Sequence, residues 1–218
     1  MRKVLSIIIA GIIFISVNAQ TAVFSYSSSS ITVNNNFVDE LYHESHAGLT
    51  PYVLKSSEEM SVQNNSYTIK CYKFNGWEDE MGDFNVIEIY HKGKSILQLK
   101  NDAGWDYFQK DNIPLSLRKT YKSFIPILLD NNTGVIMFNG AIDANDPRLL
   151  TMIILKDGIA KLIYNKEADI TSVLAYTDKT VFNLQLNVIE YHDDHIPYNE
   201  AELAELEFKN GMIYYTDK

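Results

Sequence analysis

The sequence predicts a mainly β fold: a single domain with an antiparallel sheet built from β-hairpins, arranged as a sandwich, an open barrel or a curved meander, plus one or two short helices. Three observations support this prediction. Apolar and polar residues alternate with a period of two along much of the chain, as in half-buried strands. Turn signals such as Asp-Gly and Asn-Gly separate these runs. No Pro/Gly-rich linker divides the 218 residues.

Residues 1–19 predict a secretory signal peptide. MRK is a cationic start, VLSIIIAGIIFISV an apolar core, and VNA supplies small residues before a cleavage site at Gln20. This apolar run is too short for a transmembrane anchor, and no later run is long enough to cross a bilayer. We therefore expect a chain exported to the periplasm or the cell exterior, with no membrane insertion after cleavage. The short cationic start and the lack of disulfides favour a bacterial source.

The next two segments are expected to differ in structure. Residues 20–36 are rich in Ser and Asn, which predicts a flexible or edge-strand leader, so we place the start of the domain at residue 37. Phe37, Val38, Leu41 and Tyr42 follow the spacing i, i+1, i+4, i+5, and Gly48 follows them. This spacing favours a short helix between residues 36 and 48.

The rest of the domain is predicted to consist mainly of strands and hairpins. Residues 66–74 (SYTIKCYKF) alternate with period two. Hairpin turns are expected at Lys92-Gly93-Lys94, Asp157-Gly158 and Asn210-Gly211, because Gly, Asn and Asp readily adopt the positive φ angles of a type I′ turn. Further strands are expected at 124–130, 134–140, 170–177 and 180–191.

Two more segments have some helical character. Residues 112–124 could form a helix with Pro114 in its first turn. Residues 199–208 (NEAELAELEF) fit both periodicities, and we expect a short helical turn followed by a strand.

The composition excludes several classes of partner. The net charge is −9, and it becomes −11 once Arg2 and Lys3 leave with the signal peptide. Nucleic acids and anionic membranes are bound by clusters of Lys and Arg, so neither is an expected partner. An acidic surface instead attracts a basic partner. Cys71 is the one cysteine, so no intramolecular disulfide can form, and we expect it to be a small buried hydrophobic residue.

Four of the five histidines occur in two similar clusters, YHESH and YHDDH. His43 and His46 form one pair, His192 and His195 the other, and each pair has an acid between its members. Histidines at i and i+3 can share a metal, so the two pairs could complete one four-ligand site for zinc or a similar divalent metal. The alternative, which we favour, is two polar surface segments and no cofactor.

The two tryptophans lie in similar acidic and aromatic surroundings, NGWEDEMGDF and NDAGWDYF. Such groups are typical of carbohydrate binding and of hot spots for basic partners. The candidate binding residues are therefore Trp77, Glu78, Asp79, Trp105, Asp106 and Tyr107. The alternative is that both tryptophans belong to the core.

No nucleotide-binding, serine-hydrolase or Cys–His motif is present, so no catalytic residue is assigned. We expect an exported, non-enzymatic binding protein that uses an acidic aromatic surface. An inhibitor or immunity-type protein that neutralises a basic toxin or hydrolase is the most specific form of this expectation. Two alternatives remain: a metal-dependent or carbohydrate-directed enzyme using the histidine clusters, and a β module that binds carbohydrate or another small ligand.

Overall fold

The computed structural model describes residues 19–27, 30–41, 52–74, 82–108, 122–141, 148–187 and 200–218. The strands are β1 (Thr21–Ala22), β2 (Phe24–Ser27), β3 (Ser30–Val33), β4 (Val53–Val62), β5 (Asn65–Lys73), β6 (Phe84–His91), β7 (Lys94–Asp106), β8 (Ile125–Asp130), β9 (Thr133–Gly140), β10 (Leu149–Lys156), β11 (Ile159–Glu167), β12 (Asp169–Ala175), β13 (Lys179–Gln185), β14 (Leu203–Lys209) and β15 (Met212–Asp217). In these parts of the chain the single helix is a 3₁₀ turn, η1 (Asn35–Phe37), and no helix is long and apolar enough to cross a membrane.

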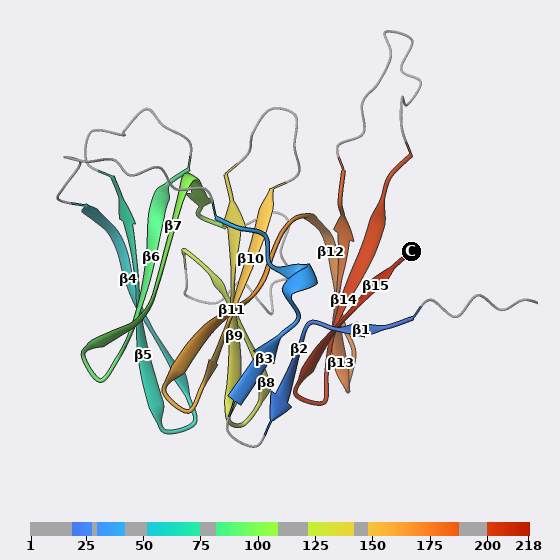
Figure 1. The fold of residues 1–218 in the computed structure, drawn as a ribbon, viewed down its shortest axis with the longest axis horizontal. Coiled ribbons are helices and arrows are strands. Elements are labelled where there is room, and N and C mark those ends of the chain that lie inside the picture. Colours follow the sequence, from blue (N-terminus) through green and yellow to red (C-terminus); the bar gives the residue numbers. More distant parts are fainter. Residues whose placement is uncertain are drawn as a thin grey trace, which may run out of the picture.

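All strand pairs in the three sheets are antiparallel. The largest sheet has the order β11-β10-β9-β7-β6-β5-β4, with β8 also paired to β9. A five-stranded sheet has the order β1-β15-β14-β13-β12, and β2 pairs with β3. Figure 1 shows the strands in three neighbouring groups, β4–β7, β8–β11 and β12–β15. The prediction of a mainly β, antiparallel fold built from hairpins is confirmed.

The middle group of strands separates two hydrophobic cores. On β9, Val135 and Met137 belong to the core shared with β12–β15, whereas Ile136 and Phe138 belong to the core shared with β4–β7. β10 has the same division, with Met152 in the first core and Ile153 in the second. Because neighbouring side chains on a strand point to opposite faces, these strands must be apolar on both faces. This explains the uninterrupted apolar runs in β9 and β10.

The three predicted hairpin turns are confirmed. Each has two consecutive residues with positive φ: 49° and 75° at Lys92-Gly93, 49° and 79° at Asp157-Gly158, and 52° and 74° at Asn210-Gly211. Positive φ at both central positions is the geometry of a type I′ turn, whose twist matches that of the flanking strands.

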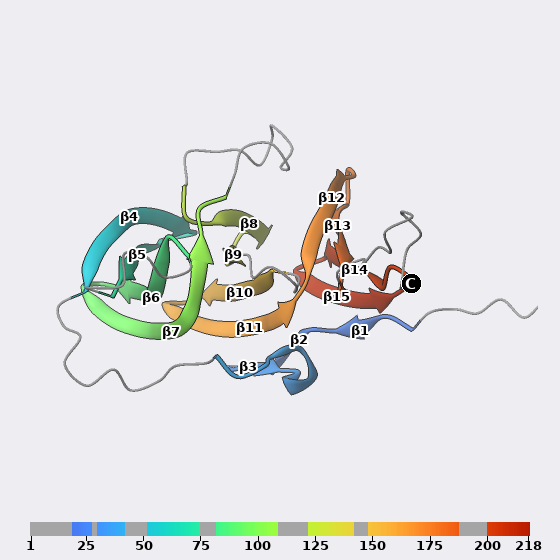
Figure 2. The ribbon, with the colours of Figure 1, turned by 90° about the horizontal axis from the view of Figure 1, so that it is seen from above.

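The leader corrects the predicted boundary at residue 37. The segment 20–36 contains β1, β2 and β3, and β1 pairs with β15. Val23 is fully buried and Phe24 is 1% exposed, and both belong to the core shared with β12–β15. The edge-strand alternative therefore describes this segment, and residues 21–37 belong to the domain. Figure 2 shows β1–β3 running along one side of the molecule.

The expected helices are not found where the structure describes those segments. Val38 is extended and forms a parallel bridge to Asn165, so the helix expected in 36–48 does not include residues 38–41. Residues 200–202 have no regular structure, and the strand expected after them begins at Leu203. Residues 42–48 and 112–121 of the expected helices lie outside the described residues, and 122–124 are not helical.

Candidate binding pocket

Many of the sequence-predicted site residues fall outside the described part of the chain. These residues are His43, His46, Trp77, Glu78, Asp79, His192 and His195. A metal site formed by the two histidine pairs therefore stays a prediction. Among the residues that the structure describes, no group of three or more His, Cys, Asp or Glu side chains could hold a metal ion.

Trp105 lies in the core and not on a binding surface. Its side chain is fully buried, with its ring stacked at 6.1 Å on that of Phe84. Its Nε1–H donates to Thr151 Oγ1 at 2.9 Å, and Thr151 in turn donates to Asn165 Oδ1 at 2.8 Å. A buried indole N–H needs such a partner. The core alternative therefore describes Trp105.

The neighbouring candidates Asp106 and Tyr107 lie at the end of β7. Asp106 is half-buried and is in register with Asn139 of β9. The Tyr107 backbone N–H donates to Asp83 Oδ2 at 2.8 Å, and its hydroxyl donates to the Lys55 carbonyl at 3.3 Å. Burial is the main cause that raises the pKa of Tyr107. These contacts hold Tyr107 against neighbouring segments. Because Trp105 is fully buried, it does not form a surface together with the half-buried Tyr107.

Cys71 is buried beside a polar cluster formed by Ser56, Ser123 and Glu58. The two hydroxyl oxygens are 2.5 Å apart, and Ser123 Oγ donates to Glu58 Oε1 at 2.8 Å. Glu58 also accepts from the backbone N–H groups of Lys122 and Ser123. Burial raises the pKa of Cys71 to about 12, against the lowering effect of hydrogen bonds from the two serines. The thiol is therefore protonated at neutral pH and unsuited to nucleophilic attack.

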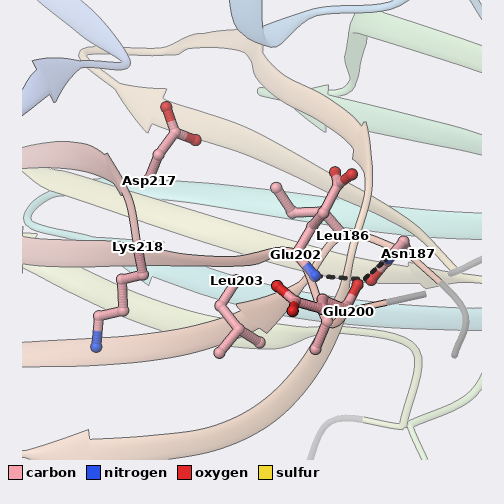
Figure 3. A pocket seen from close by; sticks show the side chains of 8 residues that line it. Leu186, Asn187, Glu200, Glu202, Leu203, Asp217 and Lys218 are labelled. Carbon is pink, nitrogen blue, oxygen red and sulfur yellow. Dashed lines mark hydrogen bonds between the residues drawn. The ribbon is translucent and has the colours of Figure 1, made fainter. Parts of the chain in front are cut away.

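A cavity with a volume of about 530 Å³ lies at one end of the five-stranded sheet. It is formed where β13 ends, β14 begins and β15 ends (Figure 3). Its lining residues are Leu186, Asn187, Glu200, Ala201, Glu202, Leu203, Asp217 and Lys218. We call this cavity the acidic pocket, because three of its side chains are carboxylates and one is a lysine.

Hydrogen bonds of Leu186 and Asn187 hold two sides of the acidic pocket together. The Leu186 N–H donates to the Glu202 carbonyl at 2.8 Å. The Asn187 side chain donates to the Glu200 carbonyl at 2.8 Å and accepts from the Glu202 N–H at 2.9 Å (Figure 3). At the third side, the Lys218 N–H donates to the Leu203 carbonyl at 3.0 Å. The pocket walls are therefore tied to the strand ladder of the sheet.

The electrostatics of the acidic pocket favour a cation. Lys218, its single basic residue, forms an ion pair with Glu205, which does not line the pocket. The Tyr215 hydroxyl donates to Asp217 Oδ1 at 2.6 Å. Burial, this hydrogen bond and the charges of Asp217 and Glu202 raise the pKa of Tyr215. Three carboxylates and a lysine that is already paired leave the pocket with a net negative charge, so it is suited to an ammonium or guanidinium group.

Sequence reasoning did not find the acidic pocket. Glu200 and Glu202 lie in the segment 199–208, for which the sequence predicted a helical turn and then a strand, and no binding role. Asp217 is 15 residues further along the chain from Glu202, and it reaches the same site because β14 pairs with β15, placing Ala204 opposite Asp217. This pairing follows from the Asn210-Gly211 turn, which was predicted, so the register of the hairpin was the available signal.

Comparisons with known proteins assign no family. No protein-family model matches the chain, and no curated protein matches it. A crystal structure of a conserved protein named as a lipoprotein, from Clostridium novyi NT, is similar to 72% of this chain and 89% of its own, with 17% sequence identity and a TM-score of 0.28. A similarity of this size carries no argument about function.

Proposed function

We propose that this chain is an exported, non-enzymatic binding protein whose acidic pocket receives a basic group of a protein partner. An inhibitor or immunity-type protein, which would neutralise a basic toxin or hydrolase, is the form that we favour. The observation that carries the proposal is the placement of Glu200, Glu202 and Asp217 around one cavity whose lysine already has a partner outside it.

The charge distribution also supports a basic partner. The segments 169–187 and 200–218, which contain β12–β15, carry seven acids against three lysines. The segments 52–74 and 82–108, which contain β4–β7, carry six acids and six lysines. The acidic excess is therefore greater around the pocket than on the strands β4–β7. Complementary charge of this kind steers a partner toward one surface and raises its association rate.

The test begins with the identification of a partner and ends with its affinity. The mature chain, beginning at Gln20, would be used to capture proteins from the extracytoplasmic fraction of its source, and a captured protein would then be purified. Its dissociation constant would be measured by calorimetry for the wild type and for the double variant Glu200→Gln/Glu202→Gln. We expect the double variant to bind about tenfold more weakly, since exposed ion pairs contribute roughly 0.2–1 kcal/mol each and partly buried ones more.

A matched control separates the pocket from the net charge. Glu59 on β4 and Glu167 on β11 are exposed, so Glu59→Gln/Glu167→Gln removes the same two charges elsewhere. This control should bind as the wild type does. Equal affinities for the wild type and both double variants would contradict the role of the pocket. Turnover of a substrate by the purified mature chain would contradict the non-enzymatic assignment.

A further inference from the structure

The outer face of β4–β7 carries tyrosines and lysines that the proposed function does not use. On β5 every second side chain from Tyr67 to Lys73 is buried, so Lys70 and Tyr72 point to the opposite, outer face. In the strand register, Glu88 of β6 lies opposite Lys70 of β5. Val86 of β6 lies opposite Tyr72 on one side and Lys100 of β7 on the other, so Tyr72 and Lys100 are on the same face. We call the set Tyr52, Lys70, Tyr72, Glu88, Tyr90 and Lys100 the tyrosine–lysine face. Figure 1 shows the strands β4–β7 at one side of the molecule, with β12–β15 at the other.

Side-chain contacts fix the rings of this face. The Tyr90 hydroxyl donates to Glu88 Oε2 at 2.6 Å and is also hydrogen-bonded to Tyr72. The rings of Tyr52 and Tyr72 are 6.3 Å apart. Lys70 Nζ lies 4.8 Å from the centre of the Tyr90 ring, and Lys100 Nζ lies 5.4 Å from that of Tyr52. Each ammonium is therefore held over an aromatic ring by a cation–π contact.

The two lysines differ from the lysines on the five-stranded sheet. Lys179, Lys209 and Lys218 each form an ion pair with a carboxylate. Among the described residues, no ion pair engages Lys70 or Lys100. Glu88 lies directly opposite Lys70 in the strand register, yet it accepts its hydrogen bond from Tyr90. Within the part of the chain that the structure describes, these two half-buried lysines thus have no carboxylate partner.

We propose that the tyrosine–lysine face binds an acidic polysaccharide. The charge is complementary, because uronate carboxylates of such a glycan can pair with the ammonium groups of Lys70 and Lys100. Its sugar rings have apolar C–H faces that pack on aromatic rings, and its hydroxyls can reach polar groups such as Gln98, which is exposed and in register with Glu88. Aromatic rings fixed on neighbouring strands suit an extended chain.

Two other polyanions fit this face less well. Nucleic acids and anionic membranes are bound by dense clusters of Lys and Arg. The strands β4–β7 and their described flanks have as many acids as lysines, and the face itself has two lysines beside Glu88. A uronate chain has a lower charge density than either, and it offers the apolar ring faces that tyrosines require. The proposal uses no residue of the acidic pocket and does not depend on the function proposed for it.

The experiment is affinity electrophoresis of the mature chain in native gels that contain polygalacturonate. We expect the wild type to be retarded as the polygalacturonate concentration rises, and not to be retarded by neutral dextran. The variant Lys70→Gln/Lys100→Gln should show an apparent affinity about tenfold lower, since each exposed ion pair is worth a factor of a few. Tyr72→Ala should lower the affinity as well, through the lost ring contact.

A control and two further results decide the outcome. Lys92→Gln/Lys94→Gln removes two exposed lysines at the β6–β7 hairpin end, so it has the same net charge as the test variant and should be retarded like the wild type. Circular dichroism would check that each variant is folded. The proposal is overturned if polygalacturonate does not retard the wild type, or if it retards the two lysine double variants equally. Sedimentation of the wild type with phosphatidylglycerol vesicles, without retardation by polygalacturonate, would show a membrane-binding face and would also overturn it.

Discussion

At the scale of single residues, burial determines what the side chains of Trp105 and Cys71 can do. Trp105 and Cys71 are both fully buried. For Trp105 the sequence left two alternatives open, because an indole beside acids and aromatic residues is found in cores as well as at binding sites. Cys71 was expected to be buried from its place in an alternating strand, and the structure confirms this. Period-two alternation thus predicted that Cys71 is buried. No local pattern could predict the burial of Trp105, because its hydrogen-bond partner Thr151 is 46 residues away in the sequence.

The buried thiol predicts a loss of stability in alkaline solution. The pKa of Cys71 is raised by burial from 9.0 to about 12 in the folded chain, so the folded state holds its proton while the unfolded state releases it above pH 9. The free energy of unfolding should therefore be unaffected by this group below pH 9 and decrease as pH rises toward 12. The expected contribution at pH 10 is on the order of 1 kcal/mol. Urea unfolding at pH 8, 9 and 10 measures it.

A variant isolates the thiol from other groups that titrate in the same range. Burial also raises the pKa values of Tyr164 and Tyr215, so the wild type should lose stability with a contribution from these phenols as well. Cys71→Ala removes one titrating group, and its unfolding free energy should decrease less steeply between pH 9 and 10. Identical slopes for the wild type and Cys71→Ala would show that the thiol titrates alike in the folded and unfolded states.

At the scale of secondary-structure elements, the hairpins are the best-predicted part of the fold. The signal for a type I′ turn is local, because two residues determine the backbone angles that connect the strands. The helix expected in 36–48 was wrong at residues 38–41 because Val38 and Asp39 pair with Asn165. The sequence separation of these partners is more than 100 residues, so no local pattern could reveal this pairing. The sequence left the leader open between a flexible segment and an edge strand for the same reason, since its strand β1 pairs with the distant β15.

Two hairpin glycines provide a matched pair of variants. Gly93 and Gly158 have φ angles of 75° and 79°, but a Cβ at Gly93 has no atom within 4 Å, whereas one at Gly158 would lie 2.9 Å from the His91 ring. The His91 ring is held by a 3.1 Å contact between Nδ1 and the Ser66 carbonyl, and it lies 5.3 Å from the Tyr67 ring. Gly93→Ala should cost about 1–2 kcal/mol from backbone strain alone. Gly158→Ala should cost about 1 kcal/mol more, because the His91 ring must move.

The extra cost can be assigned to His91 directly. In the double variant Gly158→Ala/His91→Ala the obstructing ring is gone, so the added alanine should cost about as much as it does at Gly93. Thermal or urea unfolding of the single and double variants measures each term as a double-mutant cycle. Equal costs at Gly93 and Gly158 in the presence of His91 would contradict the contact.

At the scale of the whole molecule, three groups of strands place two different surfaces at opposite sides. The acidic pocket lies at one end of the sheet formed by β1 and β12–β15, and the tyrosine–lysine face lies on β4–β7 (Figure 1). The class of fold was predictable from composition and periodicity, but the strand order was not. The acidic pocket was predictable only in part: the Asn210-Gly211 turn gives the β14–β15 register that brings Asp217 near Leu203, but no local pattern gives the β13–β14 pairing that adds Leu186 and Asn187.

Export is a proposal at this scale as well. A cleavable signal peptide predicts that the mature chain begins at Gln20. Both proposed surfaces would then be in contact with partners outside the cytoplasm.

The central claim is that charge at the acidic pocket guides a basic partner, and the salt dependence of the association rate tests it most directly. Association of the purified partner with the mature chain would be followed by surface plasmon resonance as sodium chloride is raised. Exposed charges are screened beyond about 8 Å at physiological ionic strength, so the association rate should decrease steadily while the dissociation rate changes little. The decrease should be smaller for Glu200→Gln/Glu202→Gln. An association rate that is independent of salt in the wild type would contradict the account.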